Sequence, residues 1–270
     1  MSDKFVFWRI VFDVVDSNIR LQQEITCWEL VEADTHYWRR NERLIVDLQP
    51  QIVGYVNLTH DHAEFRGGYI ECDTHDIREF QINCLGTPGS GTSIPFDGEN
   101  ISIRADVRLP ESVDMPEYPF FYLEQKPFVD ENGDPIEQPI VQPVMLTEQR
   151  VHIPDQHLAY QVKWEIDGRP YLARYPFGLN PFEDWHRLRV HQDDGPDPDT
   201  SVFKFRVDAV PLQPRNLEVG PNNYQFDSVP QRLIIGGKPD LDGNIIGLHG
   251  DIAYLEFDPN DSCRKCLLMD

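Results

Sequence analysis

The stretch 101–109, ISIRADVRL, alternates apolar and polar residues at every position. A period of two puts the apolar side chains on one face of an extended strand and the polar side chains on the other. The stretches 158–166 (LAYQVKWEI) and 203–209 (FKFRVDA) share this pattern. Half-buried strands of this kind pair mostly in antiparallel sheets, so the three stretches predict sheets with one face in a core.

Further strands are expected along most of the chain, at 5–15, 44–48, 64–71, 77–82, 118–123, 143–147, 185–191, 232–236 and 251–257. Clusters of Gly, Pro, Asn and Asp separate these stretches, as turns do. The 22 prolines disfavour long helices, and only residues 28–43 are expected to hold a short one. Many strands with frequent turns predict an all-β fold, either a sandwich or a barrel.

Acidic residues dominate the charge of the chain. Lys and Arg number 24 against 46 Asp and Glu, a net charge of −22. Such a surface repels nucleic-acid phosphates and anionic lipid, so neither is an expected partner. It suits either a salty or calcium-rich medium or simple solubility.

Nothing in the sequence predicts insertion into a membrane or secretion. There is no run of about 20 apolar residues that could span a membrane as a helix. The N-terminal residues lack the basic, apolar and small segments of a signal peptide. The expectation is synthesis in the cytoplasm, with possible incorporation into a virion or extracellular particle.

The cysteines do not predict a disulfide framework. They are five in number and thinly spread: Cys27, Cys72, Cys84, Cys263 and Cys266. Cys263 and Cys266 form a CxxC pair, but no second pair at similar spacing completes a zinc site. Incidental thiols are the favoured interpretation, and a local disulfide or a metal clip stays open for the last pair.

From residue 63 onward the order of features resembles a known family. AEFRGGYI at 63–70, WEIDGR at 164–169, DWHRLRV at 184–190 and the closing pair RLIIGG (232–237) and GLHGDIAYLEF (247–257) follow one another. This order resembles the concanavalin A-like, laminin-G-like jelly roll. The resemblance implies an antiparallel β-sandwich, a jelly roll over 63–258 with a Pro-rich insertion at 110–143, and a C-terminal tail at 259–270.

Residues 1–62 are expected to form an N-terminal β-rich extension or a small β subdomain. FWRI at 7–10 followed by WEL at 28–30 faintly resembles discoidin-like β-sandwiches. The favoured alternative is a strand pair that extends the main sheets.

Two incomplete catalytic or metal motifs occur. THDH at 59–62 could place His60 and His62 on one strand face as metal ligands, with His75 as a third candidate, but a solvated loop is favoured. Glu165 and Asp167 are similar to the first two carboxylates of the E-x-D-x-x-E strand of jelly-roll glycosidases. Pro170 stands where the third carboxylate is needed, so no complete catalytic set is predicted.

Acidic loops are the better candidates for a metal site. Two of them carry closely spaced carboxylates, at Asp193, Asp194, Asp197 and Asp199 and at Asp240 and Asp242, and the loop 130–134 is similar. Calcium takes six to eight oxygen ligands from flexible loops of this composition. Asp and Asn also dominate ordinary turns, so calcium is a possible cofactor and a turn role is the alternative.

Trp164 and Trp185 lie within strand patterns and are expected in the core, whereas an exposed Trp could stack on a sugar ring. Taken together, the sequence predicts a non-catalytic structural or adhesion subunit of a larger assembly, of virion, tail or surface-appendage type. The partners would be protein subunits, glycans or both. The alternative is a lectin-like carbohydrate-binding module, possibly calcium-assisted, and a glycoside hydrolase is the less favoured third option.

Overall fold

The computed structural model describes most of the chain. The described residues are 4–32, 37–58, 63–86, 101–109, 117–125, 144–151, 159–166, 168–176, 184–197, 199–215, 219–221, 224, 230–248 and 250–259. The expected loop 130–134, Cys263 and Cys266, the pair His60 and His62, most of the insertion and nearly all of the tail lie outside them. No helix in these residues is long and apolar enough to cross a membrane.

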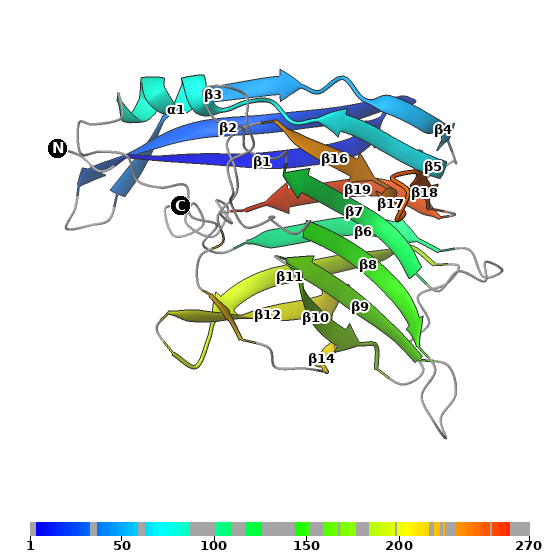
Figure 1. Cartoon of the computed structure of the whole chain (residues 1–270). Coiled ribbons are helices and arrows are strands. Elements are labelled where there is room, and N and C mark those ends of the chain that lie inside the picture. The colour runs from blue at the N-terminus through cyan, green and yellow to red at the C-terminus, as the bar shows by residue number, and fades with distance from the viewer. Residues whose placement is uncertain are drawn as a thin grey trace.

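Antiparallel pairing joins the strands into two layers that face each other (Figure 1). The first layer runs in the order β3 (Tyr37–Asp47), β2 (Asn18–Glu32), β1 (Lys4–Val15), β19 (Asp251–Asp258), β6 (Ser102–Arg108), β11 (His186–Asp194) and β12 (Thr200–Val207). The short strands β13 (Val210–Pro211) and β15 (Gly220–Pro221) pair with β12.

The second layer runs in the order β4 (Gln51–Leu58), β5 (Ala63–Asp73), β16 (Gln231–Ile235), β7 (Glu117–Gln125), β8 (Val144–Val151), β9 (Ala159–Ile166), β10 (Arg169–Arg174) and β14 (Gln213–Pro214). A separate hairpin is formed by β17 (Gly237–Pro239) and β18 (Ile245–Gly247). β5 also pairs with β19 at one end, and this pairing joins the layers into one system.

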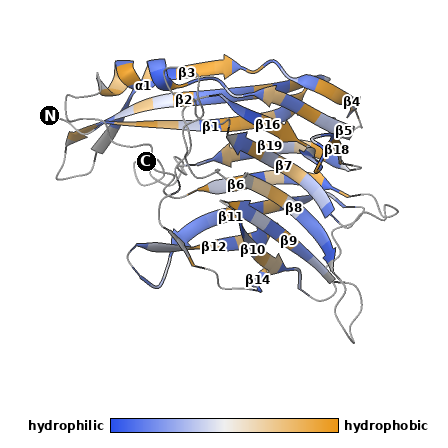
Figure 2. Cartoon of the chain, in the orientation of Figure 1, coloured by the Kyte–Doolittle hydropathy of each residue, from blue (hydrophilic) through white to orange (hydrophobic). Residues whose placement is uncertain are grey.

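Aromatic side chains fill the space between the layers. Trp164 of β9 lies 6.2 Å from the ring of Phe203 on β12 and 6.4 Å from that of Phe257 on β19. Phe121 of β7 lies 4.9 Å from Phe257. Hydrophilic and hydrophobic residues share single strands in Figure 2, as strands with one buried face require. The predicted all-β sandwich of jelly-roll type is therefore confirmed.

The N-terminal strands belong to the same sheets as the rest. β1 pairs with β19 from Ile10 to Asp13, and β4 pairs with β5 across its length. Residues 1–62 thus contribute strands to both layers. The division of the chain at residue 62 stays a prediction.

Two expected elements are wrong. Residues 77–82 are expected as a strand, but Ile77 is the N-cap of α1 (Arg78–Leu85) and the other five residues lie in this helix. The Asp76 carboxylate accepts a hydrogen bond from the Arg78 backbone N–H at 3.0 Å, which satisfies a donor at the helix start. The helix expected at 28–43 is instead the hairpin of β2 and β3, where Glu29 lies directly opposite Arg39.

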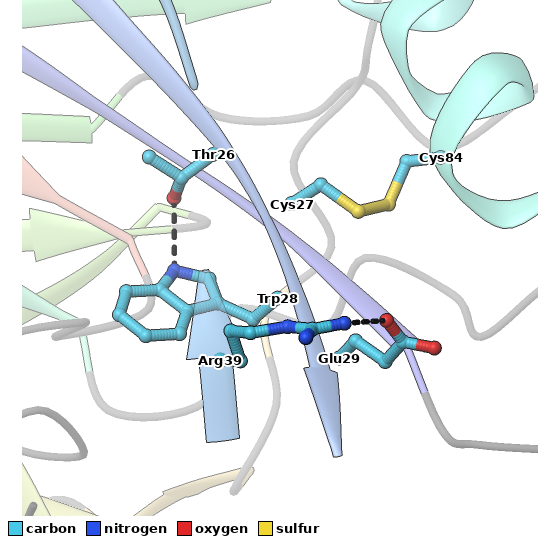
Figure 3. Close-up of a disulfide and its surroundings, with 6 residues drawn as sticks. All are labelled: Thr26, Cys27, Trp28, Glu29, Arg39 and Cys84. Atoms are coloured by element: carbon cyan, nitrogen blue, oxygen red, sulfur yellow. Dashed lines mark hydrogen bonds and ion pairs between the residues drawn. A yellow bond between two sulfur atoms is a disulfide. The ribbon is translucent and has the colours of Figure 1, made fainter. Parts of the chain in front are cut away.

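A disulfide joins the helix to the sheet (Figure 3). Cys27 of β2 and Cys84 of α1 are bonded across 57 residues, with their Cα atoms 6.1 Å apart. The expectation of thinly spread, incidental thiols is therefore wrong for this pair, because the fold brings together cysteines that are distant in sequence. Cys72 is free and half-buried, and burial raises the pKa of its thiol to about 12.

Candidate functional site

One face of β11 points outward and carries unusual side chains. The side chains that alternate into the interior from this strand are those of His186, Leu188, Val190 and Gln192. The opposite phase therefore places Arg187, Arg189 and His191 on the outer face, in line with Trp185 just before the strand. Trp185 is half-buried rather than fully buried, so its expected place in the core is wrong, whereas Trp164 is fully buried as expected.

Trp185 lines a pocket of about 430 Å³ on this outer face. The pocket is lined by Asp106, Trp185, His186, Arg187, Asp208, Ala209 and Ala253. Ala253 lies at an irregularity in the pairing of β19 with β6, between Ile252 and Tyr254. Bulges of this kind redirect the strand and occur often beside binding sites. A volume of this size lies within the range of small-ligand pockets, about 300–1,000 Å³.

The polar lining of the pocket is held in place by its neighbours. Arg187 donates to both oxygens of Asp106, at 2.5 and 2.6 Å, and this hydrogen bonding raises the pKa of Arg187. The Asp208 carboxylate accepts from the Arg187 backbone N–H at 2.9 Å, and the Asp208 N–H donates to the Arg187 carbonyl at 2.8 Å. Asp208 has a φ of +50°, which Asp tolerates better than most residues in a turn. Asp106 therefore holds the Arg187 guanidinium, and Asp208 is held by the Arg187 backbone.

A partly buried ionic cluster supports the indole. The Arg108 guanidinium lies 5.1 Å from the centre of the Trp185 ring. Arg108 donates to Asp251 at 2.6 Å and to Glu64 at 3.0 Å. Glu64 is fully buried, and Arg66 also donates to it at 2.9 Å. These contacts restrict Arg108, so it can act as a fixed support under the aromatic ring.

His186, one of the residues that line the pocket, belongs to a buried pair. His186 Nε2 lies 3.1 Å from a carboxylate oxygen of Glu148 on β8, in the opposite layer. Burial alone would lower the pKa of His186, but the charge and hydrogen bond of Glu148 and the Asp184 carbonyl raise it overall. The pair links the two layers at the pocket wall.

The expected calcium loops are separate from this pocket. Asp193 forms an ion pair with Lys204, and Asp240 accepts backbone hydrogen bonds from Asp242 and Asn244, each at 2.9 Å. Asp194, Asp197 and Asp199 are exposed. Within the described residues, no three His, Cys, Asp or Glu side chains are grouped so as to hold a metal ion. Calcium binding in these loops stays a prediction.

The other candidates are dispersed. Glu165 faces outward on β9 and pairs with Lys163 at 2.5 Å, while its strand neighbours Trp164 and Ile166 are buried. Asp167 lies outside the described residues. The backbone of His75 exchanges hydrogen bonds with the Gln23 side chain, at 2.6 and 3.2 Å.

The pocket residues were missed by reasoning from the sequence, although a signal existed. In 185–191 (WHRLRVH) Trp185 shares the phase of Arg187 and Arg189, not that of the apolar residues. That phase predicts an outward indole. Asp106 likewise alternates with the buried residues of 101–109. Asp208 and Ala253 gave no such signal, because they enter the pocket through a turn and a pairing irregularity.

No protein-family model matches the sequence, and no curated protein matches it. Among solved structures, the chain is similar to an endo-1,3-β-glucanase from Streptomyces sioyaensis, with 12% identity, 88% of this chain and 75% of that chain covered, and a TM-score of 0.31. It is also similar to the κ-carrageenase of Pseudoalteromonas carrageenovora in complex with an oligosaccharide, with 9% identity, coverage of 94% and 79%, and a TM-score of 0.32. A galactohydrolase matches at 9% identity and a TM-score of 0.30, with coverage of 94% and 79%.

These comparisons correct the expected function. The three solved structures are glycoside hydrolases, and none is a structural or adhesion subunit. The expectations of a non-catalytic structural subunit and of a chain that is not an enzyme are therefore wrong. At identities of 9–12% and TM-scores of 0.30–0.32 these likenesses identify no substrate or active site here.

Proposed function

We propose that this protein binds carbohydrate through the pocket at Trp185. The single observation that carries the proposal is the outward indole in a pocket that Asp106, Arg187 and Asp208 also line. The apolar C–H face of a sugar ring packs on an aromatic side chain, and convergent polar groups fix the hydroxyls. Asp106, Arg187 and Asp208 supply such acceptors and donors, already held in position by one another.

The support beneath the ring favours binding over a merely exposed side chain. Arg108 is held by Asp251 and Glu64, so the indole faces a rigid partner. A site that is rigid before the ligand arrives loses less conformational entropy on binding. The order of features from residue 63 also supports assigning the sandwich to the concanavalin A-like, laminin-G-like type.

A glycan array followed by calorimetry on the best ligand tests this function. Trp185→Ala is expected to weaken binding about tenfold or more, because the aromatic contact area is lost. Trp28→Ala is the matched control, since Trp28 is also half-buried but lies on β2, where its Nε1 donates to Thr26 at 3.1 Å (Figure 3). If no glycan binds, or if both variants bind like the wild type, the proposal fails.

Calcium assistance is tested in the same assay. Binding measured with excess calcium and then with a chelator would show whether the loops at Asp193 and Asp240 contribute. A loss of affinity on chelation that calcium restores supports calcium as a cofactor. Equal affinity in both conditions rules out assistance of this binding.

A second candidate function is hydrolysis of the bound glycan. Two carboxylates, Asp106 and Asp208, line the same pocket, and glycosidases use a pair of carboxyl groups. Release of reducing ends from the bound glycan by the wild type, but not by Asp208→Asn, would establish turnover at this site. Binding without any release would leave the pocket as a recognition site.

A further inference from the structure

Three arginines form a row across the outer face of the first layer. In the register of the strands, Arg189 of β11 lies directly opposite Arg206 of β12 on one side and Arg104 of β6 on the other. Arg189 and Arg206 are exposed. Directly opposite residues have Cβ atoms about 4.5–5.5 Å apart, so like charges there repel and destabilise the sheet.

Three neighbouring basic side chains on this face are paired. Arg187 binds Asp106, Arg104 binds Glu256 at 3.1 Å, and Lys204 binds Asp193. Within the described residues, Arg189 and Arg206 have no acidic partner. Two uncompensated arginines thus face each other in a chain with a net charge of −22. An arrangement that costs stability without an internal partner points to an external one.

The row is continuous with the proposed sugar pocket. Arg189 follows Arg187 by two positions on the same face of β11, a spacing of about 7 Å along the strand. Arg104 precedes Asp106 by two positions on the same face of β6, which is the same spacing. The guanidinium of Arg104 also stacks on Tyr254, 4.6 Å from the ring centre, which holds this end of the row. A sugar unit next to the one on Trp185 would lie over the three arginines.

We propose that the arginine row binds an acidic substituent, a sulfate or a carboxylate, on a glycan whose neighbouring sugar occupies the Trp185 pocket. This inference rests on the proposed function and adds the ligand class. Guanidinium groups donate paired hydrogen bonds to oxyanions, and neighbouring arginines become mutually compatible once an anion lies between them.

The overall negative charge does not prevent this. The screening length is about 8 Å at physiological ionic strength, so an anion on the row senses the nearby guanidinium groups more than distant carboxylates. The net charge instead slows the approach of a polyanion at low salt. The preferred ligand is therefore a glycan with an acidic substituent at the position over the arginine row, and not a glycan that is densely charged along its length.

Dextran is compared with dextrans of matched length that carry only a few sulfate groups or only a few carboxymethyl groups, because the three share one backbone and the charged forms stay sparsely charged. The wild type is expected to bind at least one charged form about tenfold or more tightly than dextran. The better of the sulfated and carboxylated forms identifies the substituent. The double variant Arg189→Gln/Arg206→Gln is expected to lose this preference.

Arg39→Gln/Arg40→Gln is the matched control. It also removes two positive charges, from exposed positions on β3, so the net charge of the two variants is equal. The control is expected to keep the preference within about twofold. A similar loss in both variants would reduce the effect to net charge and overturn the inference, as would a wild type that prefers neither charged dextran.

Trp185→Ala separates this inference from the proposed function. If the array finds neutral glycans that need Trp185 while the charged dextrans bind no better than dextran, the inference fails and the proposed function stands. If charged dextrans bind through the row but Trp185→Ala leaves every affinity unchanged, the pocket at Trp185 does not bind the sugar. That result contradicts both the proposed function and this inference. Thermal unfolding of each variant checks that it is folded.

Discussion

β9 and β11 have the same alternating pattern and each is associated with one tryptophan, yet their tryptophans point in opposite directions. Trp164 shares the phase of Val162 and Ile166 and is fully buried against Phe203 and Phe257. Trp185 shares the phase of the arginines and faces the outside. Whether a tryptophan is buried is therefore predicted better by its position in the apolar–polar alternation of its strand than by its residue type.

The outer faces of the two strands also differ. On the β9 side, Lys163 pairs with Glu165, and Gln161 donates to Gln149, which donates to Glu117. On the β11 side, the described residues leave Arg189 and Arg206 without an acidic partner. A face whose polar groups satisfy one another needs nothing further, whereas a face with surplus donors can still bind a ligand.

The largest expected contrast is between the two tryptophans. Trp164→Ala should lower the free energy of unfolding by about 3–5 kcal/mol, since a large ring is removed from a closed core. Trp185→Ala should lower it by less than about 1.5 kcal/mol, because that ring is already partly in contact with water. Urea unfolding of both variants measures the difference. Equal losses would show that Trp185 is a core residue after all.

The buried pair of His186 and Glu148 should make stability depend on pH. The folded-state pKa of His186 lies above its ordinary value of 6.5, so the contribution of the pair is complete below about pH 6.5 and is lost as the pH rises through the folded pKa. Glu148→Gln should cost about 3 kcal/mol at pH 6, and less at higher pH. Unfolding curves between pH 5 and 9 test this. A cost that does not fall with rising pH would contradict it.

On the β9 face a single charge should matter little. Lys163→Gln is expected to lower the free energy of unfolding by about 0.2–1 kcal/mol, because the pair with Glu165 lies near the surface. It should leave glycan affinity unchanged. A loss of affinity in this variant would move the binding site to the second layer.

The smallest effect should have the opposite sign. Arg189→Gln is expected to raise the free energy of unfolding by a few tenths of a kcal/mol, since it removes repulsion from Arg206 and Arg104. Arg39→Gln, which removes an exposed arginine paired with Glu29, should not raise it. Thermal unfolding at low salt compares the two, and a destabilised Arg189→Gln variant would speak against repulsion in the row.

The alternation at 101–109, 158–166 and 203–209 was sufficient to predict the sandwich, because a strand with one buried face must alternate. The helix at Arg78–Leu85 was missed because eight residues with a single buried side chain show no helical period. The pairing of Cys27 with Cys84 depends on how the helix docks on β2, which spacing does not reveal. The outward direction of Trp185 could be predicted from its alternation with the arginines of 185–191. The pocket is also lined by Asp208 and Ala253, which are brought there only by the fold.

The bond between Cys27 and Cys84 encloses β3, β4 and β5 in a covalent ring. A single break in the backbone anywhere between these cysteines therefore leaves one molecule of unchanged mass, apart from one added water. Such a nicked protein would run as a single band on a denaturing gel until a reductant is added, and then as two fragments. Damage by proteases in this region would go unnoticed in any preparation analysed only without reduction.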